Sequence, residues 1–160
     1  MVKAYIAIGS NKGNREHNVI KALKKMEKGL TIKKISPFFT TPPEEGANGG
    51  FFINSVIEVE TKFSPENLLL FLQNIEKSMG RKFPHKTGDE RTIDLDIIFY
   101  GNIVIKTGNF FVPHPKYSKR YFVVFPLYEI APLIKDPETG ESISVIYRRL
   151  ISNEDSKESR

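Results

Sequence analysis

The stretch "ERTIDLDIIFYG", residues 90–101, places two carboxylates inside a run of Ile, Leu and Phe. Side chains alternate along a β-strand, so Asp94 and Asp96 share one face while the apolar residues between them share the other. At the usual rise, the two Asp Cα atoms lie about 7 Å apart, and Asp is depleted from strands. This stretch therefore predicts a strand with one packing face, formed by Ile93, Leu95 and Ile97, and one working face.

The paired aspartates favour metal or phosphate chemistry. Mg²⁺ prefers oxygen ligands and is usually held by one or two carboxylates together with substrate phosphates. The loop before the strand is crowded with cations, which balance charge on a transferred phosphoryl group; they are Arg81, Lys82, His85, Lys86 and Arg91. A solvated sheet face and a solvated loop are the alternatives for each feature alone, but the combination favours a polyphosphate site.

The first hundred residues have the pattern β-α-β-β-α-β. Ser64 is a good N-cap, Pro65 fits the first helical position, and Gly80 fits a C-terminal stop. The expected strands cover 3–10, 30–41 (interrupted by Pro37, so an edge or a bulge), 51–63 and 92–100, and the expected helices cover 15–29 and 64–80. This order predicts an α+β fold, a ferredoxin-like antiparallel sheet with helices packed on it.

A C-terminal extension follows this core. Residues 103–107 and 110–115 are typical of short strands, residues 117–132 of a helix broken at Pro126, and residues 142–152 of a short final helix. We expect one domain over 1–152 and a polar, disordered tail over 153–160.

Composition limits the function classes. The 160 residues suffice for one core, and the absence of cysteine excludes disulfides and thiolate metal sites. The N-terminus lacks signal-peptide features, and the apolar runs are far shorter than the roughly 20 residues that span a membrane. We therefore expect a cytoplasmic protein with no membrane partner. The net charge of +5 suits an anionic ligand, although a solvated Lys-rich surface explains it equally well.

Three further motifs are weaker. The turn "GSNKGN" (9–14) offers backbone N–H groups to an anion, but it matches no Walker or Rossmann pattern. Phe52 and Asn54 share a strand face, where one can stack on a flat ring and the other can hydrogen-bond its edge. His114 lies between two prolines in "VPHP", near several cations, so it is a candidate phosphate ligand or a structural histidine.

Six motifs together resemble one family. "AYIAIGSN", "TTPP", "FFINSVIEVET", "RTIDLDII", "VPHP" and "PLYEIAP" occur between about residues 2 and 135, in the order seen in 6-hydroxymethyl-7,8-dihydropterin pyrophosphokinases of the folate pathway. The resemblance implies transfer of the pyrophosphoryl group of ATP to the pterin hydroxymethyl oxygen, which releases AMP. It also implies two Mg²⁺ ions, with ATP and the pterin as the only partners of a monomer that binds no nucleic acid.

The resemblance also implies residue roles. The catalytic residues would be Arg81, Arg91, Asp94 and Asp96, and the two aspartates would hold the metals. ATP would be bound by Glu76, Lys86, Ile97, His114 and Arg120. The pterin would lie between Phe52 and Phe122, with its polar edge read by Asn54 and the neighbouring backbone; the full pterin set is Thr41, Pro42, Pro43, Phe52, Asn54 and Phe122.

Two other readings remain open at this stage. The chain departs from the family pattern in the basic loop (Phe83, Thr87, Gly88) and at Asn109 and Pro115, so a catalytically silent relative that binds nucleotide or pterin is one alternative. The other is an RNA-binding module with the same sheet, although its aromatic RNP motif is absent and paired aspartates repel phosphates. Release of AMP from ATP would support the pyrophosphokinase, and no product from a folded protein would favour one of these two alternatives.

Overall fold

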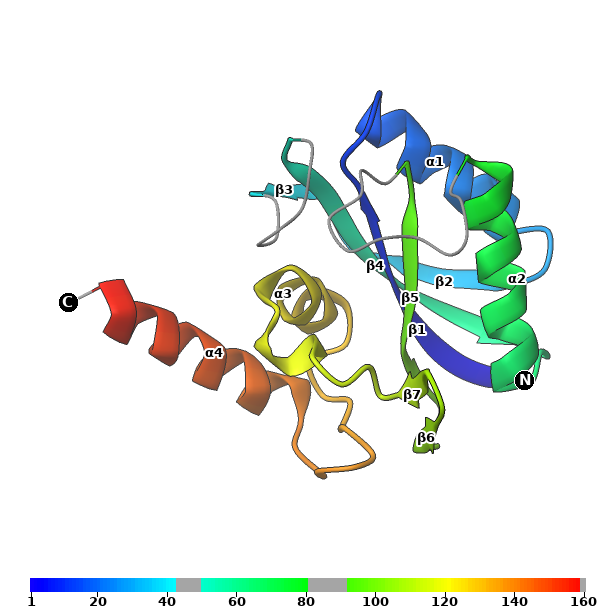
Figure 1. The fold of residues 1–160 in the computed structure, drawn as a ribbon. Helices are drawn as coiled ribbons and strands as arrows, with labels where there is room; N and C mark the ends of the chain where they lie inside the picture. The colour runs from blue at the N-terminus through cyan, green and yellow to red at the C-terminus, as the bar shows by residue number, and fades with distance from the viewer. Residues whose placement is uncertain (43–49, 81–91, 159–160) are drawn as a thin grey trace.

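The computed structural model describes residues 1–42, 50–80 and 92–158, with 154–158 as backbone only. Its core has the predicted order of strands and helices, and Figure 1 shows the sheet between two groups of helices. The elements are β1 (Val2–Ser10), α1 (Arg15–Met26), β2 (Thr31–Ile35), β3 (Phe39–Thr41), β4 (Phe52–Thr61), α2 (Pro65–Ser78), β5 (Asp94–Tyr100), β6 (Ile105–Thr107), β7 (Phe110–Val112), the 3₁₀ helix η1 (Tyr117–Lys119), α3 (Tyr121–Ile130) and α4 (Ile143–Glu158).

The five-stranded sheet has the order β2-β4-β1-β5, and β3 also pairs with β4. Every pairing in this sheet is antiparallel. The predicted interruption at Pro37 is confirmed, because β2 ends before it and β3 begins after it, both along the same edge of β4. Ser36 bridges the gap: its backbone N–H donates to the Val56 carbonyl, and its Oγ accepts the Val56 N–H at 2.9 Å.

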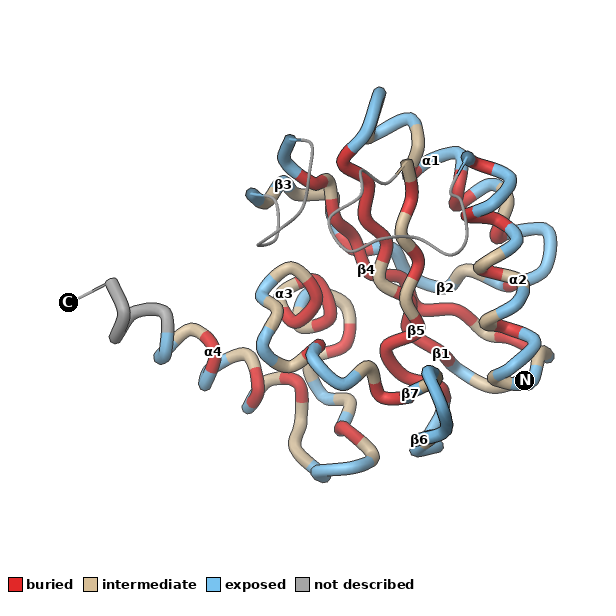
Figure 2. The backbone as a smooth tube through the Cα atoms, in the orientation of Figure 1, coloured by how far each residue is buried: buried red, intermediate tan, exposed pale blue. Residues whose placement is uncertain are grey.

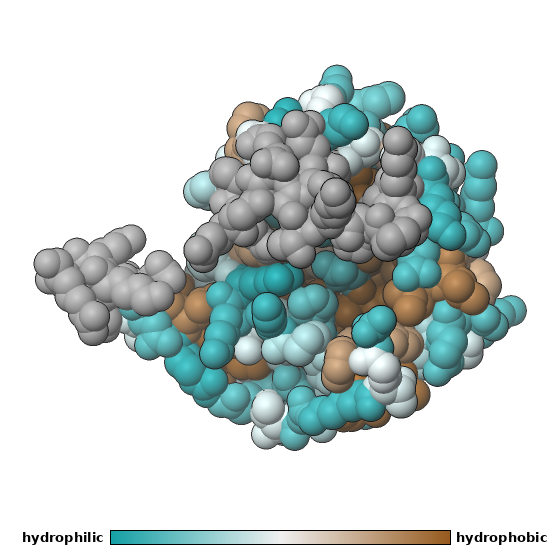
Figure 3. All heavy atoms as spheres, in the orientation of Figure 1, coloured by the Kyte–Doolittle hydropathy of each residue, from teal (hydrophilic) through white to brown (hydrophobic). Residues whose placement is uncertain are grey.

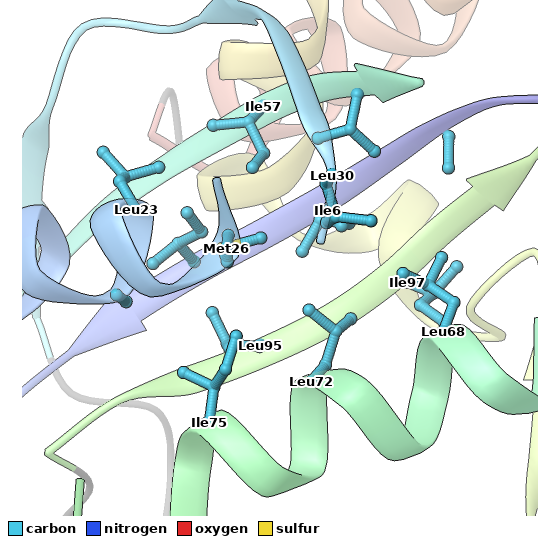
Figure 4. Packing of buried hydrophobic residues seen from close by; sticks show 14 of the residues in the cluster. Ile6, Leu23, Met26, Leu30, Ile57, Leu68, Leu72, Ile75, Leu95 and Ile97 are labelled. Atoms are coloured by element: carbon cyan, nitrogen blue, oxygen red, sulfur yellow. The ribbon is translucent and has the colours of Figure 1, made fainter. Parts of the chain in front are cut away.

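Helices α1 and α2 cover one face of the sheet, and both begin at polar caps. Asn14 accepts the His17 N–H, and Ser64 accepts the Asn67 N–H at 3.1 Å ahead of Pro65. Gly80 ends the second helix region with φ +102°, which favours glycine. Figure 4 shows the resulting core, in which side chains of both helices meet those of three strands; the labelled residues are Ile6, Leu23, Met26, Leu30, Ile57, Leu68, Leu72, Ile75, Leu95 and Ile97.

Helix α3 packs on the other face of the sheet, and the start of α4 packs against α3. The sequence predicts a break at Pro126, but α3 continues through that residue, so this prediction is wrong. Proline cannot donate to the carbonyl four residues earlier, which costs about 3 kcal/mol in a helix interior. Burial of Val123, Val124 and Leu127 offsets that cost, because each fully buried side chain contributes roughly 1.5–3 kcal/mol. The helix begins at Tyr121, and residues 117–119 form η1 instead.

The C-terminal extension differs from expectation in length. The two predicted short strands form the antiparallel hairpin β6–β7. Helix α4 extends to Glu158, beyond the predicted helix end at Ser152, and it runs away from the sheet in Figure 1. The division into a domain over 1–152 and a tail stays a prediction.

Burial follows the two layers. In Figure 2 the buried backbone concentrates in the central strands and on the inner sides of the helices, whereas β6 is mostly exposed. On the side shown in Figure 3, hydrophilic atoms cover much of the described surface and hydrophobic atoms lie in separate patches. Among the described helices, none combines the length and the apolarity needed to cross a membrane.

Candidate functional site

Strand β5 separates its side chains as its sequence predicts. Ile93, Leu95 and Ile97 are buried in the core under α1 and α2. Asp94 and Asp96 alternate with them and point to the α3 side, where both are only half-buried. The predicted separation into a buried apolar face and a half-buried acidic face is therefore confirmed, and the role of the acidic face stays a prediction.

The sheet register places Asp94 in one row with Asn54. Gly9 of β1 pairs with Asp94 on one side and with Asn54 on the other. Neighbouring strands lie about 4.8 Å apart, so the Cα atoms of Asp94 and Asn54 are about 10 Å apart across Gly9. The next row pairs Asp96 with Ala7. One end of the sheet thus joins the paired carboxylates to the predicted ring-binding residues.

Gly9 leaves space at the centre of this row. The sequence suggested Gly9 only as part of a turn that could bind an anion through its backbone, whereas the structure places it in β1 between Asp94 and Asn54. A Cβ at this position would lie 3.4 Å from the Phe52 ring and 3.6 Å from Asn54 Oδ1. A larger side chain would project between Phe52, Asn54 and the aspartates, on the face where a ligand would lie. The signal in the sequence is the glycine of "GSN" at the end of a strand, but only the register shows what lies beside it.

The predicted pterin residues Thr41, Phe52 and Asn54 come together at β3 and β4. Asn54 is buried, and its Nδ2 donates to Thr41 Oγ1 at 2.8 Å. This bond leaves Asn54 Oδ1 beside Gly9, as an acceptor facing the working side. Phe52 lies one row further along the same face, mostly buried. Pro42 is exposed at the end of β3, and Pro43 lies outside the described residues.

Two further predicted site residues, Arg120 and Phe122, lie at the start of α3. Arg120 precedes the helix, and its Cζ lies 5.6 Å from the centroid of the Phe122 ring, a cation–π arrangement. Phe122 is partly buried against the second core, and α3 packs on β4. Arg120, at the N-cap of α3, and Phe122, in its first turn, are therefore adjacent on the working side of the sheet.

His114 adds a neutral donor to this group. Its Nδ1 accepts the Lys116 N–H at 3.3 Å, so the ring proton lies on Nε2 and can be donated. Burial, together with the charges of Arg120 and Lys116, lowers the pKa of His114 from 6.5 to about 4, while Asp94 opposes this shift. The backbone N–H of His114 donates to the Ile98 carbonyl of β5 at 3.3 Å, and Tyr117 joins the backbones of His114 and Arg120, so both residues lie beside the strand that carries Asp94.

Glu76 and Ile97 lie apart from this group. The Glu76 carboxylate is buried and accepts the Leu95 N–H at 2.9 Å, which covers the outer edge of β5 beside α2. The Ile97 side chain is buried in the core under α1 and α2. Their assignment to ATP stays a prediction. Because the Ile97 side chain is buried, any contact of Ile97 with ATP would have to come from its backbone atoms.

Other predicted residues lie outside the described residues. These are Arg81, Lys86 and Arg91, with Lys82 and His85 of the same loop. Within the ranges that the structure describes, no cluster of three or more His, Cys, Asp or Glu side chains gathers for a metal ion. Asp94 and Asp96 nevertheless fit Mg²⁺, which takes one or two carboxylates together with substrate phosphates, because both are oxygen donors on one accessible face.

Comparison with known proteins gives consistent matches. The model of the family described as "7,8-dihydro-6-hydroxymethylpterin-pyrophosphokinase (HPPK)" matches residues 5–132. The 2-amino-4-hydroxy-6-hydroxymethyldihydropteridine pyrophosphokinase of Aquifex aeolicus is 41% identical over 137 residues, which cover 86% of this chain and 85% of the relative. The folic acid synthesis protein fol1 of Pneumocystis carinii is 38% identical over 94% of this chain, but this match covers only 20% of that longer protein.

Solved structures agree on the fold. The HPPK-DHPS protein of Plasmodium falciparum, crystallised with pteroate, superposes with a TM-score of 0.82 at 14% identity. The match covers 99% of this chain and 46% of the other, so this chain spans less than half of that protein. At this identity the likeness concerns the fold alone.

Proposed function

The chain belongs to the 7,8-dihydro-6-hydroxymethylpterin-pyrophosphokinase family, and from this premise we propose how its residues act in the reaction. A member of this family transfers the pyrophosphoryl group of ATP to 6-hydroxymethyl-7,8-dihydropterin in folate synthesis. The observation that supports the assignment of residues is the row Asn54–Gly9–Asp94, together with the bond from the His114 N–H to Ile98 of the strand that carries Asp94; Arg120 is joined to His114 through Tyr117. This row sets a ring-binding amide and a phosphate-binding carboxylate about two strand spacings apart, or about 10 Å.

The pterin binds at the Asn54 end. Asn54 Oδ1 accepts from a donor on the polar edge of the ring, while Thr41 Oγ1 holds the amide nitrogen. Phe52 and Phe122 stack on the two faces of the ring, because flat aromatic surfaces favour this arrangement. Backbone groups near Thr41, Pro42 and Pro43 complete the edge contacts.

The triphosphate binds at the aspartate end. Asp94 and Asp96 would hold two Mg²⁺ ions, which when bound would neutralise phosphate charge and lower the pKa of the attacking hydroxyl. His114 donates Nε2–H to a phosphate oxygen as a neutral group, and Arg120 supplies positive charge. We assign Arg81, Lys86 and Arg91 to the same task on the strength of the family resemblance, together with Glu76 and Ile97 toward the rest of ATP.

The chain's residues align the two substrates for in-line displacement. The pterin hydroxymethyl oxygen attacks the β-phosphorus of ATP and loses its proton to solvent. The bond from the β-phosphorus to the oxygen that bridges to the α-phosphorus breaks, so AMP leaves and the pterin diphosphate forms. Holding both reactants in one geometry removes much of the entropic barrier of such a transfer.

Formation of AMP is the direct test. The protein is incubated with Mg²⁺, ATP and 6-hydroxymethyl-7,8-dihydropterin, and nucleotides are separated by chromatography. We expect AMP and the pterin diphosphate in equal amounts. ADP would indicate single-phosphoryl transfer, and no product from a folded protein would favour the silent relative. Omission of Mg²⁺ with added chelator is expected to stop the reaction, and unchanged turnover would exclude the metal assignment.

Two finer statements also belong to this proposal. The strand order and the antiparallel pairings support a ferredoxin-like topology for the βαββαβ core. The expected monomeric state and cytoplasmic location stay predictions; sedimentation and cell fractionation test them.

A further inference from the structure

Tyr117 lies between the two phosphate-binding residues of the α3 side. It is 3% exposed, and its ring packs edge-on against Phe99, with the centroids 5.1 Å apart. Its backbone N–H donates to the His114 carbonyl at 3.3 Å, and its own carbonyl accepts the Arg120 N–H at 3.0 Å. The backbone positions of His114 and Arg120 are therefore both tied to this one residue.

The Tyr117 hydroxyl is held by a fixed acceptor. It donates to Asp136 Oδ2 at 2.5 Å, and Asp136 is 5% exposed. The other carboxylate oxygen accepts the N–H groups of Glu138 and Thr139, at 2.7 and 3.2 Å. The backbone of Asp136 bonds to Glu141 and Gly140, at 2.8 Å in each case. Hydrogen bonds within its own turn thus orient the Asp136 carboxylate independently of Tyr117.

Packing alone does not require this pair. A phenylalanine at 117 would fill the same space without a buried hydroxyl, whose desolvation a hydrogen bond must offset. The hydrogen bond of the hydroxyl therefore fixes the position of η1 relative to the turn at 136–141. Burial and Asp136 raise the pKa of Tyr117, so the hydroxyl remains a donor throughout the neutral range.

A second tyrosine in the same core offers a matched comparison. Tyr5 is 4% exposed, and its hydroxyl donates to the buried carboxylate of Glu58 at 2.6 Å. This pair joins directly opposed residues of β1 and β4. The backbone of Tyr5 is held by the sheet ladder, and neither neighbour of Tyr5 is assigned to a ligand.

We propose that the Tyr117–Asp136 hydrogen bond positions His114 and Arg120 for the triphosphate of ATP. This inference rests on the proposed function, which assigns those two residues to phosphate. Tyr117 is a positioning residue, because it acts through its neighbours and does not itself touch the substrate. The equivalent Tyr5–Glu58 bond contributes to stability alone.

The test compares Tyr117→Phe with Tyr5→Phe in steady-state assays of AMP release. Tyr117→Phe is expected to raise KM for ATP about tenfold, since small misplacements of binding groups have large effects, while KM for the pterin changes less than about twofold. Tyr5→Phe is expected to lower Tm similarly and to leave both KM values within about twofold of wild type. Asp136→Asn retains one acceptor oxygen and replaces the other with an NH₂ donor, so its KM for ATP is expected to lie between those of the two tyrosine variants. A wild-type KM for ATP in Tyr117→Phe, or an equal rise in Tyr5→Phe, would overturn the proposal.

A second measurement does not depend on turnover. Hydrogen exchange is followed at the amides of Tyr117 and Arg120, whose acceptors lie within the 114–120 segment. Faster exchange at these amides is expected in Tyr117→Phe and not in Tyr5→Phe. Unchanged protection in Tyr117→Phe overturns the positioning role even if wild-type protein releases no AMP. Absence of AMP from wild type overturns the proposed function instead, so the two failures are distinguishable.

Discussion

The two faces of the sheet are built on the same strands but serve different ends. The face under α1 and α2 is closed by aliphatic side chains, and Leu95 and Ile97 of β5 are buried there. The face under α3 carries Asn54, Asp94 and Asp96 at one end and an apolar core at the other. Packing of the apolar face positions the backbone of the strands. Because side chains alternate, this backbone then determines where the polar side chains of the other face lie. The positions of the site side chains therefore depend on the packing of the core on the opposite face of the same strands.

The largest effect is expected from the carboxylates of the working face. Asp94→Ala and Asp96→Ala each remove an expected metal ligand, worth several kcal/mol of transition-state stabilisation, so kcat should fall about a thousandfold. Stability should change by less than about 1 kcal/mol, because both side chains are half-buried rather than core residues. AMP release and urea unfolding measure the two quantities. Near-normal turnover of either variant would show that the metal assignment is wrong.

The opposite outcome is expected from the packing face of the same strand. Leu95→Ala leaves a cavity in the core, and such substitutions lower the free energy of unfolding by about 2–5 kcal/mol. Activity per folded molecule should stay within about threefold of wild type if the backbone keeps its place. Urea unfolding together with active-site titration separates the two. A thousandfold loss of activity in a fully folded sample would mean that the faces are not independent.

Substitutions of Glu76 test whether this buried residue stabilises the fold or binds ATP. Glu76→Ala leaves the buried Leu95 N–H without this acceptor, which costs about 1–3 kcal/mol of stability. Glu76→Gln is the matched control, because its amide oxygen can still accept that bond. Thermal unfolding should therefore rank wild type, Gln and then Ala. If Glu76→Gln instead keeps wild-type stability but raises KM for ATP, the ATP assignment from the family resemblance gains support over a structural role.

A pH-dependent effect is expected on the α3 side. Folded His114 has a pKa of about 4 against 6.5 when unfolded, so between these values the unfolded chain binds more protons. Stability is therefore unaffected by this group above pH 6.5 and is lost as the pH falls toward 4. His114→Gln should show a shallower loss of unfolding free energy across that window in urea titrations at several pH values. Equal slopes in the two proteins would mean that His114 is not buried among Arg120, Lys116 and Asp94 in solution.

Local patterns predicted the elements and several details of their ends. Ser64, Pro65 and Gly80 delimit α2 as expected, because capping depends on groups within a few residues. The interruption at Pro37 is local in the same sense. The failure at Pro126 has a tertiary cause, since burial of α3 against the sheet outweighs one missing backbone bond.

The candidate site was predictable only in part. Alternation alone predicted that Asp94 shares a face with Asp96 and that Phe52 shares a face with Asn54. The family resemblance added their roles, and the register shows that both pairs lie on the same face of the sheet. The importance of Gly9 and the Tyr117–Asp136 bond could not be predicted, because each depends on which strand or turn lies alongside. The residues of the basic loop stay predictions, since they lie outside the described residues.

The sequence by itself determined that β5 has one apolar and one acidic face, because a period of two residues is a property of any strand. It also determined the order of the elements and the chemistry that the aspartates and cations favour. The tertiary structure decided the register that sets Asp94 opposite Asn54 across Gly9. It also decided the backbone bonds that hold His114 against β5 and join it through Tyr117 to Arg120. Register and packing depend on the free energy of burying distant segments against each other, which no local pattern contains.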